Sequence, residues 1–101
     1  MSEAPKSALE LVMERLRKKD AEAGIEEKRL TEAQRAEIAE ARSVYEARVA
    51  ERKILHQSAV AGVFDPAERA EREAELRRDL ERFETERDAK IRRIREDAAT
   101  G

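Results

Sequence analysis

The chain has 101 residues, of which 46% are charged and only 3% are aromatic. This length supports one small domain, but so few large apolar side chains cannot fill a globular core, so the composition favours an extended all-α molecule. The formal net charge of −2 creates no field that would attract nucleic acid or anionic lipid, and the absence of cysteine excludes disulfides and cysteine-ligated zinc.

The sequence predicts a cytoplasmic protein without a membrane-spanning segment. Its longest stretch without a charged residue, residues 54–64, is much shorter than the ~20 residues that cross a bilayer. The N-terminal "MSEAPKS" contains no apolar signal region. A chain without cysteine also suits a reducing compartment.

Three helix starts are predicted, because a small polar residue is followed three positions later by Glu or Gln, the pattern of a capping box. The pairs are Ser7 with Glu10, Thr31 with Gln34, and Asp65 with Glu68. Pro66 suits the first position of the third helix, and Gly24 suits a left-handed cap after the first. We therefore expect helices at residues 8–23, 31–62 and 66–98 and a disordered tail at residues 1–6, all in one domain of residues 1–101.

The first predicted helix, residues 8–23, has a short apolar stripe formed by Leu9, Val12, Met13 and Leu16. A stripe of this length needs a surface to cover. We expect it to pack at the open end of the two longer helices, near the linker residues Ile25 and Leu30. Pairing with another chain remains the alternative.

The second and third predicted helices share a hydrophobic repeat of eleven residues, which keeps a helical stripe nearly straight. In the second helix the stripe consists of Ile38, Ala41, Tyr45, Val49, Arg52, His56, Val60 and Val63. In the third it consists of Leu76, Leu80, Phe83, Arg87, Ile91, Ile94 and Ala98. Matching repeats predict that the two stripes face each other.

The short connection between these helices predicts a long antiparallel hairpin, with "GVFDPAE", residues 62–68, as its tip. Folding the chain at residue 64 or 65 places Val49 opposite Leu80 and Tyr45 opposite Phe83. Arg52 and Arg87 interrupt the stripes. We expect their aliphatic stems to pack while their guanidinium groups reach glutamates on the opposite helix.

No residue pattern indicates an enzyme. His56 is the only histidine and falls on the inward stripe, so we expect a structural role for it and neither a metal site nor a cofactor. The basic run "KIRRIRE", residues 90–96, suits a helix C-terminus and lacks the aromatic residues that would stack on bases. Nucleic acid is therefore not an expected partner.

The uncharged stretch of residues 54–64, "ILHQSAVAGVF", has apolar side chains on more faces than a hairpin helix can bury. An uncovered apolar surface near a tip predicts a protein partner, although small residues there also permit close approach of the helices. The expected partner-binding residues are Ile54, Leu55, Val63, Phe64, Asp65, Glu68 and Ala70.

The tip sequence "FDPAERAEREAEL" resembles the coiled-coil tip of the DksA/TraR family of bacterial RNA polymerase regulators. That motif is an acid, a second acid three positions later and an Ala two further on, which correspond to Asp65, Glu68 and Ala70. With "TEAQ" at the start of the preceding helix, the resemblance covers residues 31–96. It implies insertion of the acidic tip into the polymerase secondary channel, as the related Gre factors also do. The family's cysteine-rich zinc region has no counterpart here, and Glu68 replaces its usual Asp.

We therefore expect a non-enzymatic helical hairpin that acts by protein contact through its tip and the adjacent apolar face. The first alternative is a DksA- or Gre-like transcription regulator. The second is a self-associating structural coiled coil, and a homodimer remains open. The sequence does not identify the partner.

Overall fold

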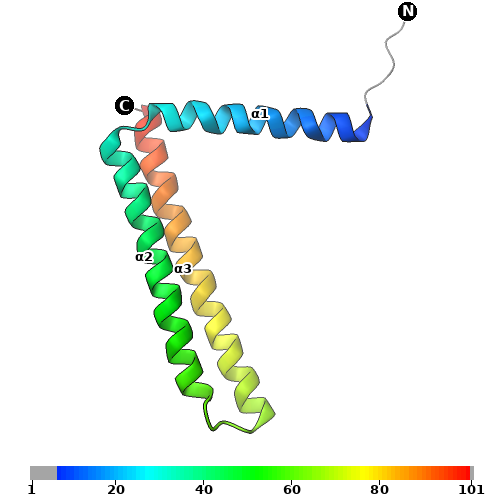
Figure 1. Cartoon of the computed structure of the whole chain (residues 1–101), viewed down its shortest axis with the longest axis vertical. Coiled ribbons are helices and arrows are strands. Elements are labelled where there is room, and N and C mark those ends of the chain that lie inside the picture. The colour runs from blue at the N-terminus through cyan, green and yellow to red at the C-terminus, as the bar shows by residue number, and fades with distance from the viewer. Residues whose placement is uncertain (1–6, 101) are drawn as a thin grey trace, which may run out of the picture. The chain divides into compact units, whose positions relative to one another are not determined.

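The computed structural model describes the backbone of residues 7–100, and the side chains of these residues except 23 and 25–28. These residues form three helices and no strand: α1 (Ala8–Arg29), α2 (Glu32–Val60) and α3 (Pro66–Thr100) (Figure 1). The all-α prediction is confirmed. The tail expected at residues 1–6 lies outside the described residues.

Each helix begins at the polar residue that the sequence indicates. The backbone N–H of Gln34 donates to Thr31 Oγ1 at 3.0 Å, and the N–H of Thr31 donates to Gln34 Oε1 at 2.9 Å, which completes a capping box for α2. Ser7 Oγ accepts from the N–H of Glu10 at 3.2 Å at the start of α1. Pro66 is the first residue of α3, as predicted.

Helix α1 ends six residues later than predicted. Gly24 does not terminate it, because the helix continues to Arg29 and Gly62 is the one described glycine with a positive φ. An interior glycine costs a helix about 1 kcal/mol relative to alanine, which further helical residues on both sides can offset. Helices α2 and α3 end within two residues of their expected positions.

The chain divides into two compact units, Met1–Leu30 and Thr31–Gly101. The first unit contains α1, whose apolar side chains Leu9, Val12, Met13 and Leu16 are exposed. The packing of this stripe at the open end of the hairpin stays a prediction, and the side chain of Ile25 lies outside the described residues.

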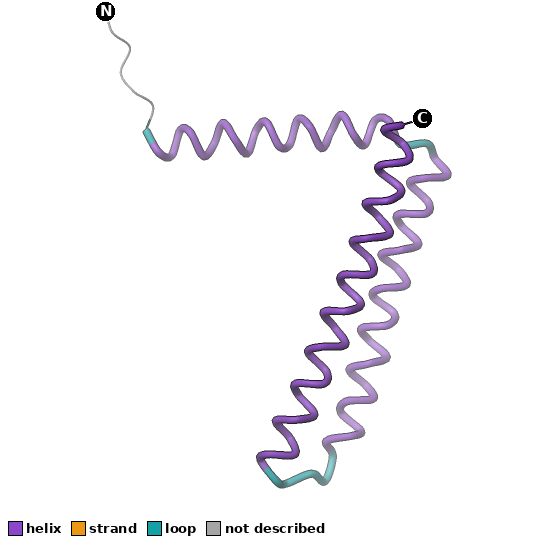
Figure 2. Tube along the Cα trace, turned by 180° about the vertical axis from the view of Figure 1, so that it is seen from behind, coloured by secondary structure: helices purple, strands orange, loops and turns teal. Residues whose placement is uncertain are grey.

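The second unit is an antiparallel hairpin of α2 and α3, which lie side by side along their length (Figures 1 and 2). Every residue of the two predicted eleven-residue stripes is buried or half-buried. The repeat in the sequence therefore identifies the faces along which the two helices pack.

Full burial in the hairpin is restricted to a few side chains. Ile38, Ala41, Phe83 and Ile94 are buried, whereas the stripe residues nearest the tip, such as Val60 and Val63, are only half-buried. Two helices cannot enclose a side chain on all sides, so the remaining stripe residues keep one flank in water. Apolar packing is therefore strongest in the half of the hairpin away from the tip.

The side-chain contacts differ from the predicted register by a few residues. Arg48 lies over the ring of Phe83 and Arg87 over the ring of Tyr45, whereas the prediction placed the two rings opposite each other. Helical side chains lean toward the N-terminus of their own helix, so in an antiparallel pair the contacts shift by about two residues relative to the backbone. The sequence-based pairing did not include this shift.

Candidate protein-interaction surface at the hairpin tip

The loop of residues 61–65 reverses the chain with a compact hydrogen-bonded turn. The N–H of Ala61 donates to the Gln57 carbonyl at 3.2 Å, and the N–H of Val63 donates to the Val60 carbonyl at 3.0 Å. Between them Gly62 has a φ of 80°, a conformation that favours glycine because it lacks Cβ. The loop backbone is thus held from the end of α2 onward.

Arg69 fastens this loop to α3. Its Nη1 donates to the carbonyl of Val63 at 2.8 Å and to the carbonyl of Val60 at 3.2 Å. The last carbonyls of a helix have no partner within the helix and carry partial negative charge, so a guanidinium group there is favourable. Arg69 was not among the residues predicted for this site. Its position near the predicted start of the third helix, within reach of the end of the second, is the signal that could have identified it.

Asp65 caps α3. Its Oδ2 accepts from the N–H of Glu68 at 3.2 Å, and its carbonyl accepts from the N–H of Arg69 at 3.0 Å. The first of the two tip acids therefore has a structural task, although Asp65, Glu68 and Ala70 are all exposed.

The tip also presents apolar side chains to solvent. Phe64 is 87% exposed, and on the last two turns of α2 Ile54 is 63% and Leu55 is 56% exposed. Val63 is half-buried. Of the four large apolar residues predicted for partner binding, three are exposed to solvent and one is half-buried. Exposed large apolar side chains without a neighbour to cover them are candidates for an interface.

Leu55 also lines a shallow groove between α2 and α3. One part of the groove is lined by Arg48, Glu51, Arg52, Leu55 and Phe83. An adjoining part shares Arg48 and Phe83 and extends past the exposed Val44 to Tyr45. Val44 and Leu55 are eleven residues apart, so they lie on one face of α2.

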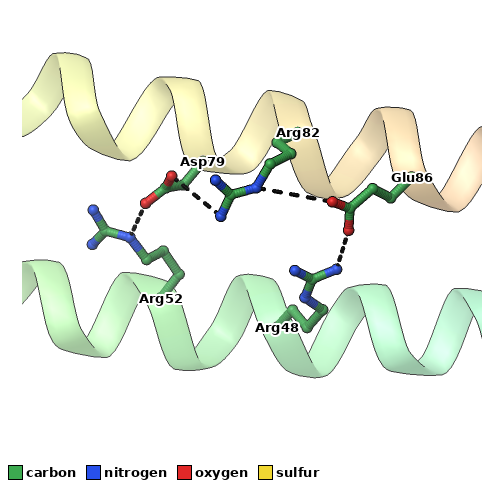
Figure 3. Close-up of polar contacts among 5 residues, drawn as sticks. All are labelled: Arg48, Arg52, Asp79, Arg82 and Glu86. Carbon is green, nitrogen blue, oxygen red and sulfur yellow. Dashed lines mark hydrogen bonds and ion pairs between the residues drawn. The ribbon is translucent and has the colours of Figure 1, made fainter.

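A ladder of alternating charges connects α2 to α3 beside this groove (Figure 3). Arg52 Nε donates to Asp79 Oδ2 at 2.7 Å, and Arg48 Nη1 pairs with Glu86 Oε2. On α3, Arg82 Nη2 lies 3.5 Å from Asp79 Oδ1, and its Nε lies 3.9 Å from Glu86 Oε1. Arg82 thereby joins the two cross-helix pairs into one network.

Arg52 behaves nearly as predicted, but Arg87 does not. Arg52 reaches the opposite helix, where its partner is Asp79 and not a glutamate, and this hydrogen bond holds the pKa of Asp79 below its usual value. Arg87 pairs with Asp88 on its own helix, which raises the pKa of Arg87. Its guanidinium carbon lies 4.2 Å from the centre of the Tyr45 ring, so its contact with α2 is a cation–π contact.

Two arginine guanidinium groups lie over the ring of Phe83 in cation–π contacts. The guanidinium carbon of Arg48 lies 4.0 Å from the centre of its ring, and that of Arg82 lies 5.5 Å away. Arg48 and Arg82 were not singled out in the sequence, because arginines are frequent throughout both helices and only the register shows which of them meet a ring or an acid.

The remaining candidate from the sequence is His56. His56 is half-buried on the inward stripe. Within residues 7–100, and leaving out the side chains that are not described, no group of three or more His, Asp or Glu residues is placed to hold a metal ion. No described helix combines the length and apolar character that a membrane span requires.

Comparisons with protein-family models, with curated proteins and with solved structures found no match. The resemblance of the tip to the DksA/TraR family therefore stays a prediction.

Proposed function

We propose that this chain is a protein-interaction module that acts through its hairpin tip and the adjacent apolar face. The observation that carries the proposal is Phe64, an aromatic side chain that is 87% exposed at the end of a hairpin. Aromatic residues, Phe among them, are enriched in protein interfaces, and a few residues enclosed in pockets of the partner carry most of the binding energy.

The loop that bears Phe64 supports this role. Gly62 and Arg69 hold the backbone on either side of it through the turn and the two carbonyl contacts described above. A side chain on an ordered loop loses less conformational entropy on binding than one on a flexible loop. The expected partner is a protein with an apolar pocket for the ring, with Ile54 and Leu55 as further contacts on α2.

The polymerase-channel alternative depends on the tip acids. Glu68 is exposed on the first turn of α3, as an acid that approaches a partner must be, whereas Asp65 is engaged in the helix cap. This favours Glu68 over Asp65 as the functional acid in that model.

Photo-crosslinking tests the proposal. A photoreactive phenylalanine analogue at position 64 should give a single saturable adduct in the native host, and excess unlabelled wild-type protein should compete it away. A Phe64→Ser competitor should fail, because it lacks the ring. A Leu11→Ser competitor is the matched control, since Leu11 is also an exposed apolar residue but lies on α1, outside the hairpin. Equal competition by the Phe64→Ser protein would exclude the tip as the contact.

The two candidate functions are separated by a second competitor, Asp65→Asn with Glu68→Gln. Asparagine caps a helix as well as aspartate, so this variant loses charge and keeps the fold. Full competition is expected if the partner binds the apolar tip. Loss of competition, together with core RNA polymerase as the crosslinked protein, would support the channel model instead.

A further inference from the structure

Helix α1 has an exposed apolar face that has no role in the proposed function. Leu9, Val12, Met13 and Leu16 are between 50% and 69% exposed. Their spacing of three, one and three residues places them on one side of this 22-residue helix. Helices in proteins gain most of their stability from packing such a face, so a complementary surface is expected to cover it.

The charges of α1 argue against a lipid surface as the occupant. Its six basic residues are matched by six acidic residues, so an anionic membrane would gain no net electrostatic attraction. The arrangement of two of these charges is more specific. Glu10 directly follows Leu9 and Arg17 directly follows Leu16, so both charges lie along the same edge of the apolar face, two helical turns apart.

A second copy of α1 in antiparallel orientation is complementary to this face. A two-fold axis between residues 12 and 13 places Leu9 of one copy against Leu16 of the other. The same axis places Glu10 of each copy beside Arg17 of the other copy, at both ends of the contact. In a parallel pair in register, each edge of one helix lies beside the opposite edge of the other, so Glu10 and Arg17 would lie on opposite sides of the contact and could not pair.

We propose that the chain forms a two-fold symmetric dimer through the apolar face of α1, with the two α1 helices antiparallel. The proposal involves no residue of the hairpin, so it stands or falls separately from a function of the tip.

Sedimentation equilibrium of the full chain over about 1–300 μM tests it. The wild-type protein should associate to a dimer. Glu10→Arg alone and Arg17→Glu alone should each weaken the dimer by roughly tenfold or more, because each turns both symmetry-related attractions into repulsions. The effect should shrink at high salt, where surface charges are screened.

An equimolar mixture of the two single variants tests whether Glu10 and Arg17 meet across the dimer. In the mixed dimer, the two arginines of the Glu10→Arg chain meet the two glutamates of the Arg17→Glu chain, so association should return to the wild-type level. Packing of α1 within its own chain cannot produce this recovery, because it does not depend on a second chain. The double variant Glu10→Arg with Arg17→Glu should also associate like the wild type.

Lys18→Glu is the matched control. It makes the same charge change as Arg17→Glu, but its position is opposite the apolar face, so the dimer should persist. A monomeric wild-type chain over the whole concentration range would overturn the proposal. So would single variants that associate as tightly as the wild type, or a mixture that fails to recover while circular dichroism shows unchanged helix content.

Discussion

Gly62 and Gly24 differ in backbone conformation, and a substitution at each is therefore expected to have a different effect. Gly62 has a φ of 80°, whereas Gly24 lies within α1. A Cβ atom added at either position would meet no atom within 4 Å, so the backbone conformation alone decides the effect of a substitution.

Gly62→Ala is therefore expected to destabilise the hairpin by about 1 kcal/mol, because alanine disfavours a positive φ. Gly24→Ala is expected to stabilise α1 by a similar ~1 kcal/mol, because alanine is the better helix former. Urea unfolding of the first variant and the helical circular dichroism signal of the second measure these effects. A neutral Gly62→Ala variant would show that the turn has another conformation.

Some residue contacts could be predicted from the sequence, and others could not. The three helix starts were predictable because each depends on residues three positions apart, as at Thr31 and Gln34. The contacts of Arg87 were not, because a guanidinium group has several acids and rings within reach and its choice depends on the register. Phe64 was identified as a candidate from its neighbours in sequence, but its exposure became known only from the structure.

At the scale of the elements, the charge ladder adds polar contacts to a pair of helices that bury few side chains. Arg52 and Asp79 form one step of this ladder, with a hydrogen bond at 2.7 Å between α2 and α3. Because the folded pKa of Asp79 is lowered below its usual 3.8, the contribution of this carboxylate is present in full above that pH and is lost as the pH falls through the lower, folded value.

Asp79→Asn should accordingly lower the free energy of unfolding at pH 7, and the difference from wild type should shrink as the pH falls below about 4. Urea unfolding at a series of pH values measures this. Asp88→Asn is the matched control, since Asp88 pairs with Arg87 within α3 and does not join the helices. An Asp79→Asn deficit that stays constant down to pH 2 would contradict the assignment.

The packing faces of α2 and α3 were predictable from the sequence, while the end of α1 was not. An eleven-residue repeat identifies the face of a helix that will be buried, whichever surface covers it. All residues of the two stripes, from Ile38 to Ala98, are indeed buried or half-buried. Gly24 carried the only stop signal for α1, and a single glycine is too weak to terminate a helix whose neighbours continue it.

At the scale of the whole molecule, the two units differ in how they are stabilised. The hairpin has a buried set of side chains that includes Ile38, Ala41 and Phe83, whereas the described large apolar side chains of α1 are exposed. Amide hydrogens exchange slowly where opening requires loss of packed structure and quickly where it does not.

Hydrogen exchange in dilute solution should therefore show the strongest protection in α2 and α3 around these buried residues and weak protection throughout α1. Protection of α1 should rise with protein concentration if its apolar face is covered by a second copy. The Lys18→Glu variant is expected to show the same rise, and the Glu10→Arg variant a smaller one. Strong protection of α1 at the lowest concentration would contradict this description.

The contact between Arg69 and the carbonyls of Val60 and Val63 has a consequence for how the hairpin forms. It joins residues only six and nine positions apart, so it closes a short loop at small entropic expense before any distant pair has met. From there the stripes of α2 and α3 can pair one helical turn at a time, from the tip toward the open end. Each new contact joins residues that are only slightly farther apart in the sequence than the previous pair. Assembly would then be fast and directional, beginning at the turn and finishing where Ile38 and Ile94 become enclosed.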